Sequence, residues 1–195
     1  MLNVSTSRRL TQGKSGLFRL LALGLTLALI PSCGEPSPSL AFPEGTPSDL
    51  QNLSQDVWEE FLAVFPNQSD CMGEVTLEGD WNLEGSRGFY LPEQTRVVLK
   101  IPATAGHLRH SLVHELAHHL EHACPDHAEL RVAFLAAQNL AGDTPWFEGL
   151  SWEETPSEQY AETAVRLVLD RPVWNYRLPL TSEAVETVRD WGGGP

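Results

Sequence analysis

An H-E-x-x-H motif, formed by His114, Glu115 and His118, constrains this chain more than any other feature of its sequence. On an α-helix, residues four positions apart share one face with Cβ atoms roughly 6 Å apart, so the two histidines can offer imidazole nitrogens to one ion. Glu115 is rotated by about 100° from His114 and would lie beside the open coordination position as a general base. The motif therefore predicts a zinc site. The alternative is a solvated, histidine-rich helix in which the motif arose by chance.

Two sets of residues recur every four positions along the predicted helix and lie on roughly opposite sides of it. One set is apolar and consists of Leu108, Leu112, Leu116 and Leu120. The other set is a histidine ladder made of His110, His114, His118 and His122. We therefore expect one face of the helix to pack against a core and the other face to carry chemistry.

The N-terminal residues have the order of a secretory signal, with four basic side chains before the apolar run 20–30 and no acidic residue before Glu35. The run is shorter than the roughly 20 residues of a membrane-spanning helix, so we predict a signal peptide over residues 1–32. The sequence before Cys33 resembles a lipoprotein processing box, which predicts lipidation of Cys33 and export to the membrane surface. The alternative is ordinary cleavage nearby, with secretion of the chain and an accidental thiol at this position.

Pro and Ser are frequent in residues 33–48, which predicts a tether ahead of a single domain over residues 49–195. If Cys33 carries lipid, Cys71 and Cys124 remain as a pair in an oxidising compartment, where a disulfide is the expected outcome. Two buried free thiols are the alternative. Removing the four basic residues of the leader leaves nine, against 26 acidic residues, a net charge of about −17. This charge argues against nucleic acid as a partner and limits membrane contact to the anchor.

Periodicity predicts an α+β fold in which a short antiparallel sheet packs on the motif helix and two or three further helices. The strands are expected at residues 75–77, 88–91 and 95–101, and the helices at 49–65, 126–141, 156–169 and 181–190. We expect strand 95–101 to be the edge on which an extended peptide pairs. Asp126 and Glu129 form a possible capping box, and His122 and His127 are expected at the surface. Three aromatic residues in the loop 143–154 either wall a substrate cleft or cover the core: Trp146, Phe147 and Trp152.

A second pair of acids, Glu158 and Glu162, lies one turn apart on a helix stripe that also carries apolar groups. Inward carboxylates need a partner, and zinc provides one, because two histidines, a glutamate and water form an open catalytic site. Glu158 is therefore predicted as the third ligand. The alternative is a capping box in which Glu158 reaches back to the amide of Thr155.

An H-E-x-x-H helix followed about 40 residues later by an E-x-x-A-E helix resembles the gluzincin metallopeptidases, in particular the catalytic domain of anthrax lethal factor and its relatives. The resemblance covers residues 95–170. It implies zinc ligands at His114, His118 and Glu158, with Glu115 as the base and Glu162 as a partner that orients a ligand. The oxyanion-stabilising tyrosine of this family has no clear match, although Tyr160 and Tyr176 are candidates. The metzincin pattern does not fit, because Glu121 replaces its glycine and Cys124 its third histidine.

The sequence thus predicts a monomeric, exported zinc metallopeptidase that acts on a peptide or protein substrate. Two alternatives stay open. One is a catalytically silent lipoprotein of the same fold that binds a partner. The other is a metal-capture module that uses the whole histidine ladder, including His110 and His122. Metal stoichiometry separates the enzyme from the capture module, since an enzyme holds one zinc tightly and a capture module holds several weakly.

Overall fold

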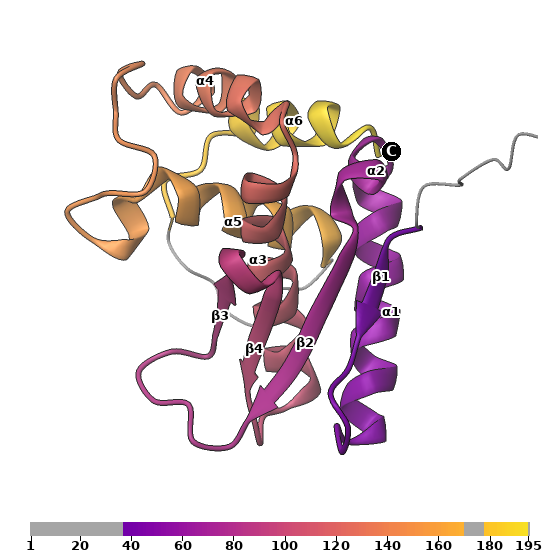
Figure 1. Cartoon of the computed structure of the whole chain (residues 1–195). Coiled ribbons are helices and arrows are strands. Elements are labelled where there is room, and N and C mark those ends of the chain that lie inside the picture. Colours follow the sequence, from indigo (N-terminus) through magenta and orange to yellow (C-terminus); the bar gives the residue numbers. More distant parts are fainter. Residues whose placement is uncertain (1–36, 170–177, 195) are drawn as a thin grey trace, which may run out of the picture. The chain divides into compact units, whose positions relative to one another are not determined.

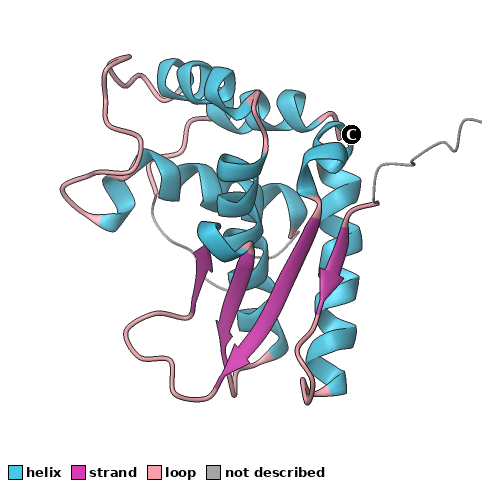
Figure 2. Cartoon of the chain, viewed as in Figure 1, coloured by secondary structure: helices cyan, strands magenta, loops and turns pink. Residues whose placement is uncertain are grey.

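The computed structural model describes residues 37–169 and 178–194, and this part of the chain contains six α-helices and a four-stranded mixed sheet (Figures 1 and 2). The α+β class is as predicted. The predicted signal peptide and Cys33 lie outside the described residues. Within the described residues, no helix combines the length and the apolar character needed to cross a membrane.

The sheet has the strand order β1-β2-β4-β3, and only its last pair is antiparallel. β1 pairs with β2 in parallel, and β2 pairs with β4 in parallel. The prediction of an antiparallel sheet was therefore wrong. The reason lies in the connection between β1 and β2, because helix α1 (Ser48–Val64) separates them in sequence and returns the chain to the end at which β1 began. The strands are β1 (Ser39–Ala41), β2 (Glu74–Asp80), β3 (Gly88–Leu91) and β4 (Arg96–Lys100).

Two sequence-based expectations about the strands need correction. β1 lies inside the segment assigned to the tether, where its three residues gave no readable periodicity. β4, expected at the edge, lies between β2 and β3, and its Val97 and Leu99 are fully buried. β3 is the edge strand next to the motif helix.

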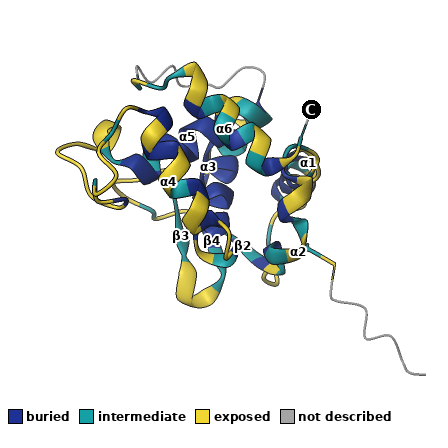
Figure 3. Ribbon diagram, turned by 90° about the horizontal axis from the view of Figure 1, so that it is seen from above, coloured by how far each residue is buried: buried dark blue, intermediate teal, exposed yellow. Residues whose placement is uncertain are grey.

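Helix α3 (Ala105–Ala123) carries the motif and packs against β3, β4, α1 and α5 (Pro156–Val168). Thr104 caps its first turn by accepting a hydrogen bond from the amide of His107. The expected apolar face is confirmed, since Leu112, Leu116 and Leu120 are fully buried. Figure 3 shows α3 as a mostly buried helix at the centre of the domain. The histidine face is partly covered as well, since His110 and His114 are buried while His122 is exposed.

The other helices complete the core around α3. Helix α1 packs on α3, and its Val57, Trp58 and Phe61 are buried. The remaining bounds are α1 (Ser48–Val64), α2 (Ser69–Met72), α4 (His127–Ala137), α5 (Pro156–Val168), α6 (Ser182–Gly192), and the 3₁₀ turns η1 (Pro66–Gln68), η2 (Pro92–Gln94) and η3 (Trp152–Glu154).

The predicted disulfide joins Cys71 in α2 to Cys124 at the end of α3, with Cα atoms 5.2 Å apart. It closes a loop of 53 residues and ties the start of β2 to the helix that carries the motif. A disulfide is compatible with an exported protein.

The environment of His127 differs from the prediction of a surface residue. Its side chain is fully buried, with the rings of Trp146, Tyr160 and Trp191 at centroid distances of 4.7 to 5.7 Å. Asp126 forms no cap bond with its side chain, which instead accepts a hydrogen bond from the indole of Trp191 at 2.9 Å. The expected capping box is thus absent because this tertiary contact takes the carboxylate. His122, by contrast, is exposed as predicted.

Candidate metal centre

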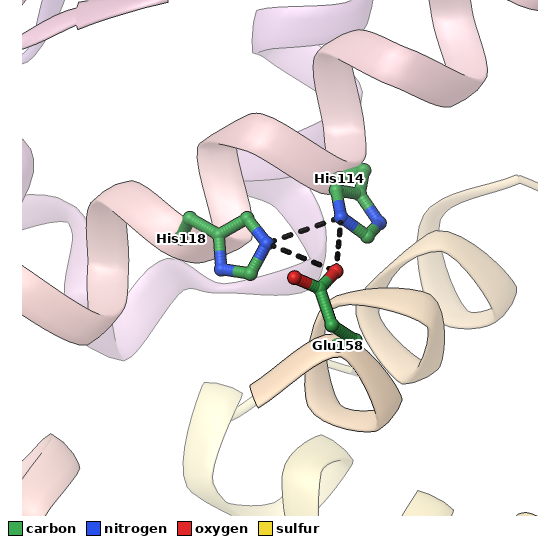
Figure 4. Close-up of side chains that lie close together, drawn as sticks. All are labelled: His114, His118 and Glu158. Carbon is green, nitrogen blue, oxygen red and sulfur yellow. Dashed lines mark hydrogen bonds and ion pairs between the residues drawn. The ribbon is translucent and has the colours of Figure 1, made fainter. Parts of the chain in front are cut away.

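Three side chains from two helices converge at the H-E-x-x-H motif (Figure 4). Nε2 of His114 lies 3.1 Å from Nε2 of His118 and 3.0 Å from Oε2 of Glu158. Nε2 of His118 lies 3.5 Å from the same carboxylate oxygen. Helix α5 places Glu158 here because its first turn, which begins at Pro156, packs against α3. The capping box is not formed, since the amide of Thr155 donates to the carbonyl of Trp152 at 3.2 Å and Glu158 points to the histidines.

The geometry of these three atoms fits a single metal ion. A tetrahedral ion with bonds of about 2.0–2.1 Å holds its ligand atoms about 3.3 Å apart. The observed separations bracket this value, and one ligand atom from each residue lies within 4.8 Å of the others. His114 is buried, and His118 and Glu158 are half-buried. The group could therefore bind a metal ion with a fourth position left for solvent.

Glu162 supports the first histidine from the side opposite the metal position. Its Oε1 accepts a hydrogen bond from Nδ1 of His114 at 3.0 Å and lies 3.0 Å from Nε2 of His110. A proton held at Nδ1 leaves the lone pair of Nε2 free for an ion. Glu162 thus lies where the sequence predicted, and His110, to which the sequence gave no definite role, is its second partner.

Glu121 holds the corresponding position at the second histidine, and the sequence analysis missed it. Its Oε2 lies 3.2 Å from Nδ1 of His118, and Ser157 donates to both of its oxygens at 2.8 and 2.9 Å. The signal that could have revealed it is its spacing, three residues after His118 on the same helix face. In the sequence, Glu121 is notable only as a departure from the metzincin pattern.

The general-base candidate Glu115 is almost entirely buried beside the edge strand β3. Burial raises the pKa of its carboxyl, although the backbone N–H of Tyr90 donates to it and the nearby histidines oppose the shift. Gly88 of β3 leaves room for it, because a Cβ at that position would lie 3.1 Å from Oε1 of Glu115. The edge strand and the base are therefore in direct contact.

Two cavities flank the three ligands, and both are lined by His114, Glu115 and Trp152. The first, of about 350 Å³, extends along the loop 85–88 toward His110. The second, of about 380 Å³, extends past His118 toward Phe147. Together they form a cleft that passes the metal position and exposes Glu115 to a bound molecule.

The aromatic loop 143–154 serves both of the roles that its sequence allowed. Trp146 is buried in the core beside Phe134 and Tyr160. Phe147 and Trp152 line the cleft, where Phe147 stacks on His122 with ring centroids 5.7 Å apart. The loop therefore anchors itself in the core through one ring and presents two others to the cleft.

The electrostatics of the site favour protons at the ligand nitrogens when no ion is bound. Burial lowers the pKa of His114, but its hydrogen bonds to Glu158 and Glu162 outweigh burial and raise it to about 9. His118 behaves in the same way through Glu121 and Glu158, with a pKa raised to about 10. Burial acts to raise the pKa of Glu158, but the two histidines lower it well below its ordinary value. An ion that binds here displaces protons from an already arranged set of ligands.

The two tyrosines suggested by the family resemblance do not supply an oxyanion donor. Tyr160 is fully buried in the aromatic core, so its hydroxyl cannot face a bound molecule. Tyr176 lies outside the described residues. Tyr90 lines the cleft, but its hydroxyl is 2.8 Å from Nδ1 of His119, which is buried and bonded through Nε2 to the carbonyl of Met72.

Comparison of the chain with protein-family models, with curated proteins and with solved structures gave no match. The likeness to the gluzincins therefore rests on the spacing of the sequence motifs.

Proposed function

We propose that this protein is a zinc metalloendopeptidase that hydrolyses peptide bonds outside the cytoplasm. The observation that carries the proposal is the position of Glu115, which lies on the same helix as two convergent histidines and lines both cavities of the cleft. A site built only to hold an ion needs no buried carboxylate beside its open face. Hydrolysis does need one, as the group that accepts a proton from water.

Zinc is the ion that this set of donor atoms fits best. Two imidazoles and one carboxylate with a fourth position open are the ligands of a common class of catalytic zinc sites. When bound, zinc supplies a Lewis acid that polarises the scissile carbonyl and lowers the pKa of water to near 7. Glu162 supports this assignment, because it holds a proton on Nδ1 of His114 and keeps Nε2 available.

The environment of Glu115 supports its role as the base. Burial raises the pKa of its carboxyl toward the working pH, which is the direction that makes a carboxylate a more effective base. The amide of Tyr90 and the absence of a side chain at Gly88 fix where the carboxylate lies. The residue can therefore take a proton from water and deliver it to the leaving amine without moving far.

The edge strand β3 supports a peptide as the substrate. One side of β3 pairs with β4, and the sheet described here ends at its other side. An extended peptide added there would gain main-chain hydrogen bonds and would run beside Glu115. Phe147 and Trp152 also line the cleft and offer apolar contacts, while the acidic body favours basic segments.

The location outside the cytoplasm is supported by the disulfide Cys71–Cys124 and by the leader-like sequence before Cys33. A lipid on Cys33 would hold the domain at the membrane surface. The silent-lipoprotein alternative is weakened by the intact Glu115. Metal capture by the whole histidine ladder is weakened because His110 is engaged with Glu162, and the ladder member His122 stacks on Phe147.

A peptide-library assay on the purified exported protein tests the proposal. We expect cleavage of a subset of peptides, its loss after zinc is removed with a chelator, and its return when one equivalent of zinc is added. A preparation that holds one zinc but cleaves no peptide in the library would contradict the peptidase assignment and favour the silent alternative.

A further inference from the structure

We propose that Glu121 is a positioning residue that fixes the imidazole of His118 with its Nδ1 protonated and its Nε2 directed at the metal. This inference rests on the proposed function for the presence of zinc, but it does not need the protein to be a peptidase. It assigns one carboxylate to each zinc-binding histidine, Glu162 to His114 and Glu121 to His118.

The first observation is the complete burial of the Glu121 carboxylate, whose side chain has no exposed surface. Burial of an ionised carboxylate is strongly unfavourable unless hydrogen bonds satisfy it. Both oxygens are satisfied, by Ser157 Oγ, by Trp146 Nε1 at 3.2 Å, and by the ring of His118. Glu121 is not part of the three-residue group that could hold the ion. A buried acid placed beside a ligand, and not in the metal position, acts through that ligand.

The second observation is how donors and acceptors are distributed around Nδ1 of His118. The nitrogen lies 3.2 Å from Oε2 of Glu121 and 3.4 Å from Oγ of Ser157. The single hydroxyl proton of Ser157 is directed at Glu121, at distances of 2.8 and 2.9 Å to its two oxygens. An ionised carboxylate can only accept, so Nδ1 must carry the proton in this arrangement. Nε2 of His118 is then the nitrogen left to bind an ion once its own proton is displaced, and it faces Glu158 and His114.

The third observation links Glu121 to the wall of the cleft. Trp146, which donates to Oε1 of Glu121, is the buried anchor of the loop 143–154, and the next residue, Phe147, lines the cavity beside His118. The carboxylate of Glu121 is therefore hydrogen-bonded both to the proposed ligand His118 and to Trp146, which anchors the loop that lines the cleft. A shift of Glu121 would move both together.

The substitution Glu121→Gln tests this role, because it keeps the shape of the side chain but replaces one acceptor oxygen by a donor group. A glutamine presents one oxygen and one NH₂ group. If the oxygen keeps the bonds from Ser157 and Trp146, the NH₂ group faces Nδ1 of His118 and forces the proton to Nε2, where it blocks the ion. We expect the zinc affinity of this variant, measured by competition with a chromophoric chelator, to fall by about 10- to 100-fold. The zinc affinity of Glu121→Asp, which keeps the negative charge, should fall by a smaller factor.

Trp146→Phe is the matched control, because it removes a bond to Oε1 and leaves Oε2 and His118 in contact. We expect it to lower the unfolding temperature while its zinc affinity stays within about threefold of the parent. Glu121→Gln protein that is folded when metal-free and binds zinc as tightly as the parent would overturn the proposal.

A measurement on the unaltered protein covers the case in which Glu121→Gln does not fold. In the zinc-loaded protein, ¹⁵N-resolved NMR of the histidine rings should show His118 with a proton on Nδ1 and zinc on Nε2. Coordination through Nδ1, or a ring without a proton on Nδ1, would overturn the inference. Neither measurement uses peptide cleavage, so failure of the peptidase proposal and failure of this one give different results.

Discussion

Oε2 of Glu158 lies 3.0 Å from Nε2 of His114, although 44 residues separate the two along the chain. The contact favours the ligand role over the helix cap, because it directs the carboxylate of Glu158 across to α3 and away from the start of its own helix. Together with Nε2 of His118, these two atoms form the three-atom group that could hold an ion.

Replacement of Glu158 by glutamine should weaken zinc binding by more than the roughly 10- to 100-fold that follows loss of an outer partner. The reason is that an amide is a poorer ligand and does not balance the charge of the ion. The measurement is zinc affinity beside the free energy of unfolding of the metal-free protein. Glu154→Gln, at an exposed acid of the neighbouring turn, is the control. A loss of about 1 kcal/mol in stability with zinc binding intact is the signature of a helix cap instead.

Gly88→Ala should reduce the rate of peptide cleavage by up to about 10²-fold while one zinc stays bound. The added Cβ would lie 3.1 Å from Oε1 of Glu115 and 3.1 Å from the carbonyl of Val98, so the carboxylate must shift. The shift needed is only a few tenths of an ångström, so the loss of about 10²-fold that a displacement of about 1 Å causes is the upper limit. Gly142→Ala, where a Cβ meets no neighbour, should leave the rate unchanged. Equal rates in the two variants would show that Gly88 does not position the base.

The buried His127 should make the metal-free protein sensitive to acid. Burial lowers its pKa to about 3, from about 6.5 in an unfolded chain. Between these values the unfolded state binds the proton and the folded state does not, so stability falls as the pH falls. The contribution is about 2 kcal/mol between pH 7.5 and pH 5. Urea unfolding at both pH values should show that His127→Phe loses less stability than the parent, and an equal loss in both proteins would refute this environment for the ring.

Loss of the disulfide should destabilise the domain by about 4 kcal/mol, the value expected for a loop of 53 residues. The double variant Cys71→Ser with Cys124→Ser isolates this effect from any free thiol. Denaturant unfolding of the oxidised parent and the variant measures it. Peptide mapping without reduction should find the two cysteines joined to each other, whereas a bond from either to Cys33 would exclude both this pairing and a lipid at Cys33.

The local parts of the site could be predicted from the sequence because helical geometry alone determines them. The spacing of His114 and His118, and the apolar face of α3, follow from 3.6 residues per turn. Prediction of the roles of Glu158 and Glu162 required one further assumption, namely that carboxylates on a buried helix face are there to interact with a metal site. The role of Glu121 was not visible, since its partners Ser157 and Trp146 come from other parts of the chain.

The arrangement of the sheet could not be predicted, because the order of strands depends on connections and not on the pattern within each strand. β1 is three residues long and carries no alternation that distinguishes it from a tether. The apolar sequence of β4 is compatible with either an edge or a central strand. Its central position is seen only in its pairing with both β2 and β3. His127 was misplaced for a similar reason, since its aromatic neighbours are distant in sequence.

The most direct test of a zinc peptidase is the Glu115→Gln variant, with bound zinc and peptide cleavage measured on the same preparation. Glu115 is not a ligand of the predicted ion, so we expect one zinc per chain, as in the parent. Cleavage should fall on the order of 10²-fold or more, because the group that accepts the proton from water is gone. Cleavage at the parent's rate, with zinc still bound, would contradict the proposed mechanism.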